Sequence, residues 1–322
     1  MQQPLISVII PTYNRLAYLK EALKSVLRQT YQNFEVIVSD DCSPESPQAL
    51  IEDLNDPRIR LRRNSKNLGV ALNVAHAFEQ AQGEYIACLN DDDLWNENFL
   101  EKLVLPLVQQ PELALAFCDH YIIDANGNVD QQETEQNSKR WYRNQLKEGI
   151  YQPFYDLGLV HQAVSPASSA VIRREMINLL ELREVGVYWD YYLTYLACRS
   201  GRGAYYCPER LTLYRIHPQS ETMTSGSRNA QAKIRKANSG IFCYERFMED
   251  TRLREFRPYF QKKWAHANTT LGIALLRTGE IERARFYLWR AMRGDFSLRS
   301  CAAMALSLTS QALTRQITGI PQ

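Results

Sequence analysis

Residues 5–14, LISVIIPTYN, begin the pattern that determines the fold of this chain. The stretch is a run of mostly β-branched, apolar residues that ends at Pro11, and this composition predicts a buried strand. After Asn14 the apolar residues recur in steps of three and four, which predicts an amphipathic helix capped by that asparagine. The apolar positions of this helix are Leu16, Leu19, Leu23, Val26 and Leu27.

The same alternation of strand and helix continues to about residue 120. Repeated units of this length indicate an α/β fold in which helices cover both faces of a Rossmann-like, mostly parallel sheet. Further strands are predicted at 34–39, 58–62, 84–89 and 113–118, and helices at about 70–82 and 96–109.

The organisation changes after residue 120. The expected elements are a polar connection at 131–150, a helix at about 187–200, and two short strands at 204–207 and 211–216. Residues 218–229 are rich in Ser, Thr and Gly, so we interpret them as a linker. The chain is thus expected to form a first domain over 1–217 and a helical domain over 230–322.

The charge of the chain is unevenly distributed. Among its 322 residues, 38 Lys and Arg against 36 Asp and Glu give a net charge of only +2, and 45% of the residues are hydrophobic. These values disfavour a nucleic-acid-binding protein and a disordered acidic one. Residues 1–227 carry 21 basic and 29 acidic side chains, whereas residues 228–322 carry 17 and 7. The near-neutral total is therefore a cancellation between an acidic and a basic part.

Cysteine usage and hydropathy indicate where the protein resides. The seven cysteines are scattered without a CxxC pair, which favours reduced thiols in the cytoplasm. Residues 1–14 lack the basic region and cleavage site of a signal peptide. The uncharged stretch 300–314 is shorter than the ~20 apolar residues of a membrane span. We expect a cytoplasmic protein, either free or bound peripherally to the inner face of the membrane.

Three polar clusters follow predicted parallel strands: Pro11–Asn14, Ser39–Asp41 and Asn90–Asp93. Ligands of open α/β sheets bind outside the carboxyl ends of the strands, so these clusters are expected to meet in one crevice. Their five carboxylates would repel one another if left bare. Oxygen ligands of this kind suit Mg²⁺ or Mn²⁺, which commonly share their coordination with substrate phosphates.

The acidic clusters also have a structural interpretation. Asp40 or Asp41 could cap the helix that begins near Ser46, and Asp91–Asp93 could cap the helix that begins near Asn96. Three consecutive acidic residues after an apolar strand exceed what one cap requires. Their joint placement on neighbouring strands favours the functional interpretation.

Five motifs in this order resemble those of family 2 glycosyltransferases, which have a GT-A fold. The motifs are SVIIPTYN at 7–14, VSDDCS at 38–43, NLG at 67–69, GEYI at 83–86 and LNDDD at 89–93. The resemblance extends over roughly residues 5–217. It implies an inverting transfer of a sugar from a nucleoside diphosphate to an acceptor hydroxyl.

The same resemblance implies the residues of a donor site. Tyr13 is expected to lie against the base, and Asp41 to accept a hydrogen bond from it. The full donor set is Pro11, Thr12, Tyr13, Asp40, Asp41, Asn67, Gly69, Asp91 and Asp92.

A metal site is implied at the end of the acidic motif. Asp93 is expected to bind Mg²⁺ or Mn²⁺ directly, with Asp92 contacting the ribose or the metal. The sequence has Asn90 where this family commonly has aspartate. Residues 214–217, YRIH, resemble a further motif in which Arg215 or His217 steadies the diphosphate or the metal, against the alternative that this histidine is structural.

A general base must take the proton of the acceptor hydroxyl as it attacks. The resemblance implies Asp190 for this role, at the start of the helix predicted at 187–200. Trp189 stands where the family commonly has glutamate. The alternative is that Asp190 only interacts with the helix dipole. Acceptor contacts are implied at 164–171, with Ser165, Ser168 and Ser169, unless this is an ordinary polar strand start.

The sequence thus predicts a metal-dependent glycosyltransferase that uses a nucleoside-diphosphate sugar, with UDP preferred, and a saccharide or lipid-linked acceptor. Two alternatives remain: a metal-dependent nucleotidyltransferase, and a degenerate binding module with this fold. The absence of GxxxxGK and GxGxxG motifs argues against an NTPase and a dinucleotide-dependent oxidoreductase. The basic C-terminal part either contacts anionic lipid or a lipid phosphate, or presents a solvated helical face to the first domain.

Overall fold

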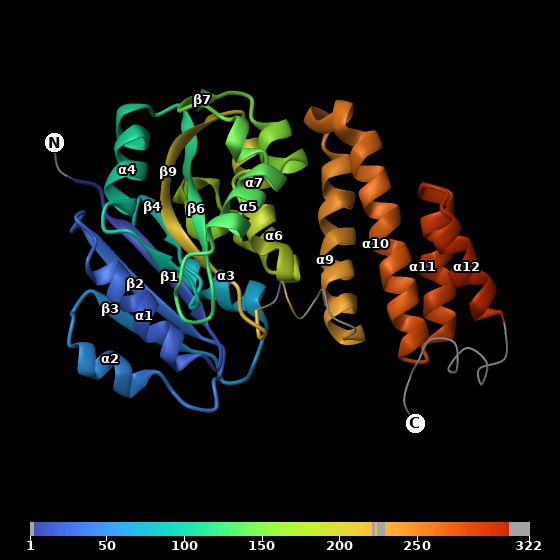
Figure 1. Cartoon of the computed structure of the whole chain (residues 1–322), viewed down its shortest axis with the longest axis horizontal. Helices are drawn as coiled ribbons and strands as arrows, with labels where there is room; N and C mark the ends of the chain where they lie inside the picture. The colour runs from blue at the N-terminus through green and yellow to red at the C-terminus, as the bar shows by residue number, and fades with distance from the viewer. Residues whose placement is uncertain (1–2, 221–222, 224–228, 309–322) are drawn as a thin grey trace. The chain divides into compact units, whose positions relative to one another are not determined.

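The computed structural model describes residues 3–220, 223 and 229–308, and the chain divides into two compact units (Figure 1). Unit 1 consists of Met1–Glu184 and Trp189–His217, and unit 2 of Val185–Tyr188 and Pro218–Gln322. Residues 185–188 therefore belong with the C-terminal helices rather than with the first domain. Of the expected linker 218–229, residues 221, 222 and 224–228 lie outside the described residues, as does the end of the uncharged stretch at 309–314.

Unit 1 is built on a nine-stranded sheet in the order β3-β2-β1-β4-β8-β6-β9-β5, with β7 paired to β9. The strands are β1 (Ile6–Thr12), β2 (Phe34–Asp40), β3 (Ile59–Arg63), β4 (Tyr85–Cys88), β5 (Leu94–Trp95), β6 (Leu113–Ile123), β7 (Gly149–Tyr151), β8 (Ala170–Arg173) and β9 (Gly203–Arg215). The four strands from β3 to β4 are mutually parallel, as predicted. β8 is antiparallel to both of its neighbours, so the complete sheet is mixed.

Helices cover both faces of this sheet (Figure 1). The helices of unit 1 are α1 (Leu16–Leu27), α2 (Gln48–Leu54), α3 (Val70–Gln80), α4 (Phe99–Gln109), α5 (Gln131–Arg140), α6 (Leu179–Leu182) and α7 (Trp189–Arg199). Because side chains alternate along a strand, Val8 and Ile10 of β1 share one buried cluster with α1 and α4. Ile9 points to the opposite face, and α3 packs on β1 and β2. All seven residues of β1 are buried, which explains its unbroken apolar sequence.

Several features differ from the sequence-based expectation. Helix α1 begins after Arg15 without a side-chain cap, so Asn14 does not cap it, and the short elements β5, β7 and α6 were not predicted. The polar connection at 131–150 contains helix α5, whose start is capped by the Asp130 carboxylate accepting a hydrogen bond from the Glu133 amide. The two short strands expected at 204–207 and 211–216 form one long strand, β9. Pairing with β6 along its length holds β9 together across shifts in register near Asp119. Such long-range pairing is invisible to local patterns.

Unit 2 is helical, as expected. Its helices are α9 (Ala230–Glu249), α10 (Arg257–Arg277), α11 (Ile281–Gly294) and α12 (Leu298–Ser307). α10 packs against α9 and α11, and α11 packs against α12. The turn between α10 and α11 contains Gly279 at φ +84°, a left-handed conformation that glycine adopts without strain. Within the residues described, no helix combines the length and apolar character needed to cross a bilayer.

Candidate active site

The three predicted polar clusters meet at the carboxyl ends of adjacent parallel strands. Thr12 at the end of β1 is in register with Asp40 at the end of β2. On the other side of β1, Ile9 pairs with Cys88, the last residue of β4, and the acidic loop 90–93 follows directly. The sheet therefore brings the three polar clusters to one end, as the sequence predicted.

Asp91 is held against the end of β1. Its Oδ2 accepts a hydrogen bond from the Thr12 hydroxyl at 2.7 Å, and its Oδ1 lies 3.1 Å from Nη1 of Arg15. Burial and the negative charge of Asp92 raise the pKa of Asp91 to about 6, while Arg15 and Thr12 act in the opposite direction. Thr12 and Asp91, both expected in the donor site, are thus in direct contact.

Asp92 connects the acidic loop to His217, which follows strand β9. Its Oδ2 lies 2.9 Å from Nε2 of His217 and 2.8 Å from Nη1 of Arg15. The His217 side chain is almost fully buried and packs against the ring of Tyr18 in α1, with centroids 4.9 Å apart. The carboxylate oxygen and the imidazole nitrogen are hydrogen-bonded at this separation, and both are atom types that can also bind a divalent cation.

Asp93 occupies a different environment from Asp92. It is fully buried, and its carboxylate accepts hydrogen bonds from Asn90 Nδ2 at 2.9 Å, the Ser168 hydroxyl at 2.7 Å and the Arg215 amide at 2.9 Å. Burial and the charge of Asp92 raise the pKa of Asp93 to about 8, and the three hydrogen bonds lower it. Asp93 therefore anchors the loop to β9 and to the segment before β8.

The three expected metal ligands are consequently not brought together. Asp92 and His217 are in contact, whereas the Asp93 carboxylate is directed to Asn90, Ser168 and Arg215. In the described ranges no group of three His, Cys, Asp or Glu side chains is arranged to hold a metal ion. The expectation that Asp93, Asp92 and His217 bind a metal ion stays a prediction, and the contact between Asp92 and His217 is the part of it that the geometry supports.

Asp41 shapes the loop that carries the NLG motif. Its Oδ1 accepts hydrogen bonds from the Leu68 amide and from Asn64 Nδ2, and its Oδ2 accepts one from the Gly69 amide, each at 2.8 Å. Gly69 has φ +85°, which favours glycine at this position. Asn67 accepts a second hydrogen bond from the Gly69 amide at 3.2 Å. Asp41, Asn67 and Gly69 thus form one structure next to β2.

Asp40 holds the turn that precedes the Asp41-bound loop. Its buried carboxylate is 2.6 Å from Nη1 of Arg63 in β3 and accepts hydrogen bonds from the amide and the hydroxyl of Ser43. These contacts fix the turn that places Asp41. Asp40, which was expected in the donor site, is thus bound by Arg63 and Ser43, and its part in donor binding stays a prediction.

Pro11 and Tyr13 lie on either side of Thr12 but differ in exposure. Pro11 is buried in β1, whereas 47% of the Tyr13 surface is exposed. The exposed Tyr13 ring can stack on a planar base.

Asp190 lies in the first turn of α7 and is partly exposed. Its charge, after burial, raises the pKa of the Cys88 thiol at the end of β4, so its carboxylate lies near the strand that leads into the acidic loop. Asp190 also accepts a hydrogen bond from the Tyr191 amide at 2.8 Å. The structure thus brings the expected base to the same end of the sheet.

Arg15 and Tyr18, both at the start of α1, were missed by the sequence analysis. The burial of Arg15 lowers its pKa, but the charges of Asp91 and Asp92 outweigh this effect and the net shift is upward. Arg15 directly follows the first motif. Because the clustered carboxylates need a counter-charge, a basic residue at this position was the signal that could have identified Arg15.

Arg215, expected at the diphosphate or the metal, is buried, and its side chain contacts the acidic loop. Its guanidinium donates to the backbone oxygens of Asp92 and Ala125 and to Glu21 in α1. The guanidinium also lies over the ring of Tyr18, 4.7 Å from the centroid. These contacts fasten the acidic loop to α1.

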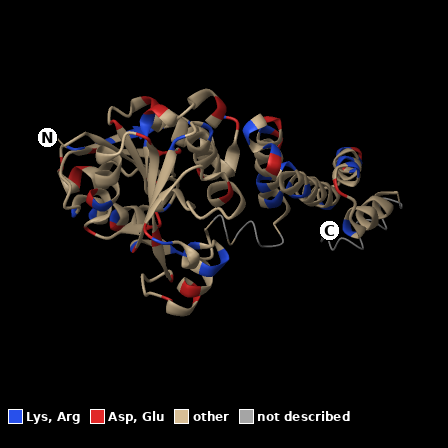
Figure 2. Cartoon of the chain, turned by 90° about the horizontal axis from the view of Figure 1, so that it is seen from above, with Lys and Arg blue, Asp and Glu red and all other residues tan. Residues whose placement is uncertain are grey.

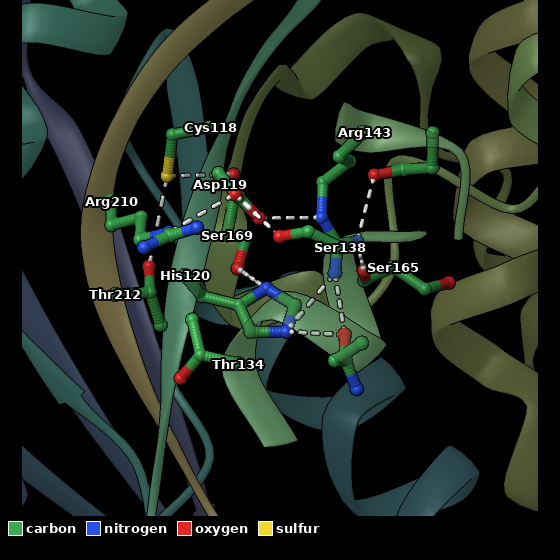
Figure 3. Close-up of polar contacts among 12 residues, drawn as sticks. Cys118, Asp119, His120, Thr134, Ser138, Arg143, Ser165, Ser169, Arg210 and Thr212 are labelled. Carbon is green, nitrogen blue, oxygen red and sulfur yellow. Dashed lines mark hydrogen bonds and ion pairs between the residues drawn. The ribbon is translucent and has the colours of Figure 1, made fainter. Parts of the chain in front are cut away.

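A buried polar network supports the segment 163–169 (Figure 3). Arg143 is 2% exposed and lies 2.7 Å from Asp119 Oδ1, and it donates to the Ser165 carbonyl at 2.9 Å and to Asn137 Oδ1 at 2.6 Å. Burial and the charge of Arg143 lower the pKa of His120 to about 3, so this histidine is neutral. Of the expected acceptor residues, Ser165 contacts Arg143 through its carbonyl and Ser168 reaches Asp93.

Comparison with known proteins settles the family. The model of the family described as glycosyl transferase family 2 matches residues 7–176, more than half of the chain. The chain belongs to glycosyltransferase family 2. The resemblance stated from five motifs is confirmed.

This family 2 member is similar to several curated bacterial proteins. It is 41% identical over 121 residues to the putative colanic acid biosynthesis glycosyl transferase WcaA of Escherichia coli K12, covering 37% of this chain and 43% of WcaA. It is 33% identical over 129 residues to the UDP-Glc:alpha-D-GlcNAc-diphosphoundecaprenol beta-1,3-glucosyltransferase WfgD of E. coli, covering 40% of this chain and 51% of WfgD. The chain spans about half the length of these relatives.

Solved structures show the same fold at low sequence identity. S. aureus TarS 1–349 in complex with UDP matches with a TM-score of 0.57 and 18% identity, covering 97% of this chain and 91% of that chain. The mannosyltransferase PcManGT from Pyrobaculum calidifontis in complex with GDP-Man and Mn²⁺ matches with a TM-score of 0.56 and 19% identity, covering 99% and 84%. The predicted GT-A-like α/β fold with C-terminal helices is confirmed.

Proposed function

We propose that this family 2 member transfers a sugar from a nucleoside-diphosphate sugar to a hydroxyl of a saccharide or lipid-linked acceptor, with inversion. The observation that carries the proposal is the meeting of Thr12, the Asp41-bound loop and the Asp92–His217 pair at one end of the sheet. UDP is the preferred nucleotide, in line with the UDP complex of TarS. Family membership favours glycosyl transfer over the nucleotidyl transfer that the sequence left open.

The donor's nucleoside is proposed to bind between the ends of β1 and β2. The exposed ring of Tyr13 stacks on the base, and the backbone around Pro11 and Thr12 forms the floor. Asp41 is already bonded to the Leu68 and Gly69 amides, so it acts on the donor through the shape of that loop and through its remaining lone pairs.

Asp92 and His217 are proposed to hold Mg²⁺ or Mn²⁺. Two protein ligands leave most of the coordination sphere to water and to the diphosphate, which matches the way such ions bind nucleotides. The ion supplies charge stabilisation for the departing diphosphate. The Mn²⁺ complex of PcManGT supports the use of a divalent metal.

Asp190 is proposed as the general base. It accepts the acceptor's proton while the hydroxyl oxygen forms a bond to the anomeric carbon, and the bond from that carbon to the diphosphate breaks on the opposite side. A single displacement of this kind inverts the configuration of the sugar.

The acceptor is proposed to be carried by a lipid, so the enzyme works at a membrane surface. The name of WfgD specifies a diphosphoundecaprenol-linked acceptor. Unit 2 adds a basic helical region with the exposed aromatic residues Phe286 and Trp289 on α11. This combination is typical of helices that rest on anionic membranes.

The test is a donor panel. Purified protein is incubated with UDP-, GDP- and dTDP-sugars and Mn²⁺, and release of the sugar is followed by mass spectrometry. We expect one UDP-sugar to be hydrolysed, and Asp190→Asn to bind the donor with unchanged affinity but to lose at least a hundredfold in rate, since a general base contributes about that much. Turnover of no nucleotide sugar would contradict the proposed function, and an unchanged rate in Asp190→Asn would contradict the assigned base.

A further inference from the structure

The guanidinium of Arg15 occupies the centre of the acidic loop. Its Nη1 is 3.1 Å from Oδ1 of Asp91 and 2.8 Å from Oδ2 of Asp92. Arg15 is the residue that precedes helix α1, and 23% of its side-chain surface is exposed. The two carboxylates are almost completely buried, so most of their counter-charge comes from the protein itself.

One oxygen atom is used twice in this arrangement. Asp92 Oδ2, which contacts Arg15, is also the oxygen that lies 2.9 Å from Nε2 of His217. Oδ2 is the Asp92 oxygen that faces His217, so a divalent ion held between the two side chains as they stand in the structure takes this oxygen as its ligand. A guanidinium and a metal ion that bind the same carboxylate oxygen lie close together. Because both are cations, they repel each other.

We infer that Arg15 is an internal counter-cation that competes with the divalent metal for Asp92. In the metal-free chain, Arg15 neutralises the acidic loop and keeps it folded against α1. Binding of the metal releases Arg15 from Asp92 while the Asp91 contact persists as a tether. The competition sets a threshold for metal binding, so the ion binds tightly only when the diphosphate adds its own negative charge and ligands.

This inference rests on the metal pair of the proposed function, so the experiment includes a variant for each. Binding of Mn²⁺ alone, without nucleotide, is measured by the loss of the free-ion signal in electron paramagnetic resonance. We expect Arg15→Gln to bind Mn²⁺ at least tenfold more tightly than the wild type. The magnitude follows because the ion no longer displaces a charge-assisted hydrogen bond, and about 1.4 kcal/mol corresponds to a factor of ten.

The matched control is Arg28→Gln. Arg28 is exposed and stands at the other end of the 12-residue helix α1, about 18 Å away along its axis. It removes the same charge without touching the acidic loop, so its Mn²⁺ affinity should equal that of the wild type. Asp92→Asn should weaken Mn²⁺ binding at least tenfold in both the wild-type and the Arg15→Gln background.

The outcomes separate the two claims. If Asp92→Asn binds Mn²⁺ as the wild type does, the proposed metal pair is wrong. If Asp92→Asn loses Mn²⁺ but Arg15→Gln binds it no more tightly than the wild type, the metal pair stands and the role of Arg15 is overturned.

A measurement on the unaltered chain avoids any loss of folding in the variant. The Arg15 guanidinium should give protected side-chain ¹⁵N resonances in the metal-free protein, assigned by comparison with Arg15→Lys. Addition of Mg²⁺ should shift these resonances and reduce their protection to that of the remaining contact with Asp91. Resonances that stay unchanged at saturating Mg²⁺ would overturn the inference.

Discussion

The acidic loop contains neighbouring aspartates with opposite tasks. Asp92 contacts the charged side chain of an arginine and the ring of a histidine, whereas Asp93 accepts from an amide side chain, a hydroxyl and a backbone amide. A chain in which adjacent residues differ this much shows why an acidic motif alone does not identify its metal ligand.

This difference leads to a prediction for two isosteric substitutions. Asp92→Asn should fold with a Tm close to that of the wild type but lose the Mn²⁺-dependent part of the thermal shift caused by UDP. Asp93→Asn should unfold more readily, by about 1–3 kcal/mol, because the amide cannot accept from Asn90, Ser168 and the Arg215 amide together. Thermal shift assays with and without UDP and Mn²⁺ measure both effects. The assignment is wrong if Asp93→Asn keeps its stability and loses only the metal response.

At the scale of elements, the segment 163–169 depends on contacts from outside itself. Arg143, in the turn after α5, donates to the carbonyls of Ala163 and Ser165, and Asp119 of β6 holds the arginine in place (Figure 3). At the end of this segment, the Ser168 hydroxyl donates a hydrogen bond to Asp93. The network therefore connects α5 and β6 to the acidic loop.

Breaking one side of this ion pair should destabilise unit 1 strongly. Arg143→Gln removes the closest charged partner of the buried Asp119 carboxylate and leaves Arg210 at 3.3 Å, so we expect a loss near the lower end of the about 3–5 kcal/mol that is typical of a broken buried pair. Asp119→Asn combined with Arg143→Gln removes both charges, so it should recover part of the loss. Chemical denaturation of the three variants measures the coupling. Equal loss in the single and double variants would show that the charge pairing contributes nothing beyond packing.

At the scale of the whole molecule, the opposite charges of the two parts of the chain suggest separate tasks. The acidic part contains the candidate active site, and the basic part contains the helices of unit 2, where blue residues predominate on the ribbon (Figure 2). On α11, Phe286 and Trp289 are 54% and 49% exposed, and Arg293 lies over the Trp289 ring. An exposed aromatic pair flanked by arginine favours contact with anionic lipid.

Membrane binding is therefore expected to depend on charge and on these two rings. The protein should float with vesicles that contain phosphatidylglycerol and not with pure phosphatidylcholine, and Phe286→Ser with Trp289→Ser should reduce flotation about tenfold. Leu105→Ser in unit 1, a residue of 55% exposure, is the matched control and should float normally. A double variant that floats as well as the wild type would exclude this surface.

Sequence by itself determined the alternation of strands and helices, the family and the three polar clusters. These features depend on local periodicity and on short motifs, and the order of the parallel strands then brings the clusters together. Helix α5 was missed because its sequence, QQETEQNSKR, has no apolar stripe. The start of this helix depends on the cap that Asp130 provides.

Only the tertiary structure decided which residues share the acidic loop. Asp92 meets His217, which is 125 positions away along the chain, and Asp93 meets Ser168, which is 75 positions away. Arg15 reaches Asp92 across 77 positions. The partners of a carboxylate depend on strand order and register, which long-range pairing sets, so they cannot be obtained from the neighbouring residues.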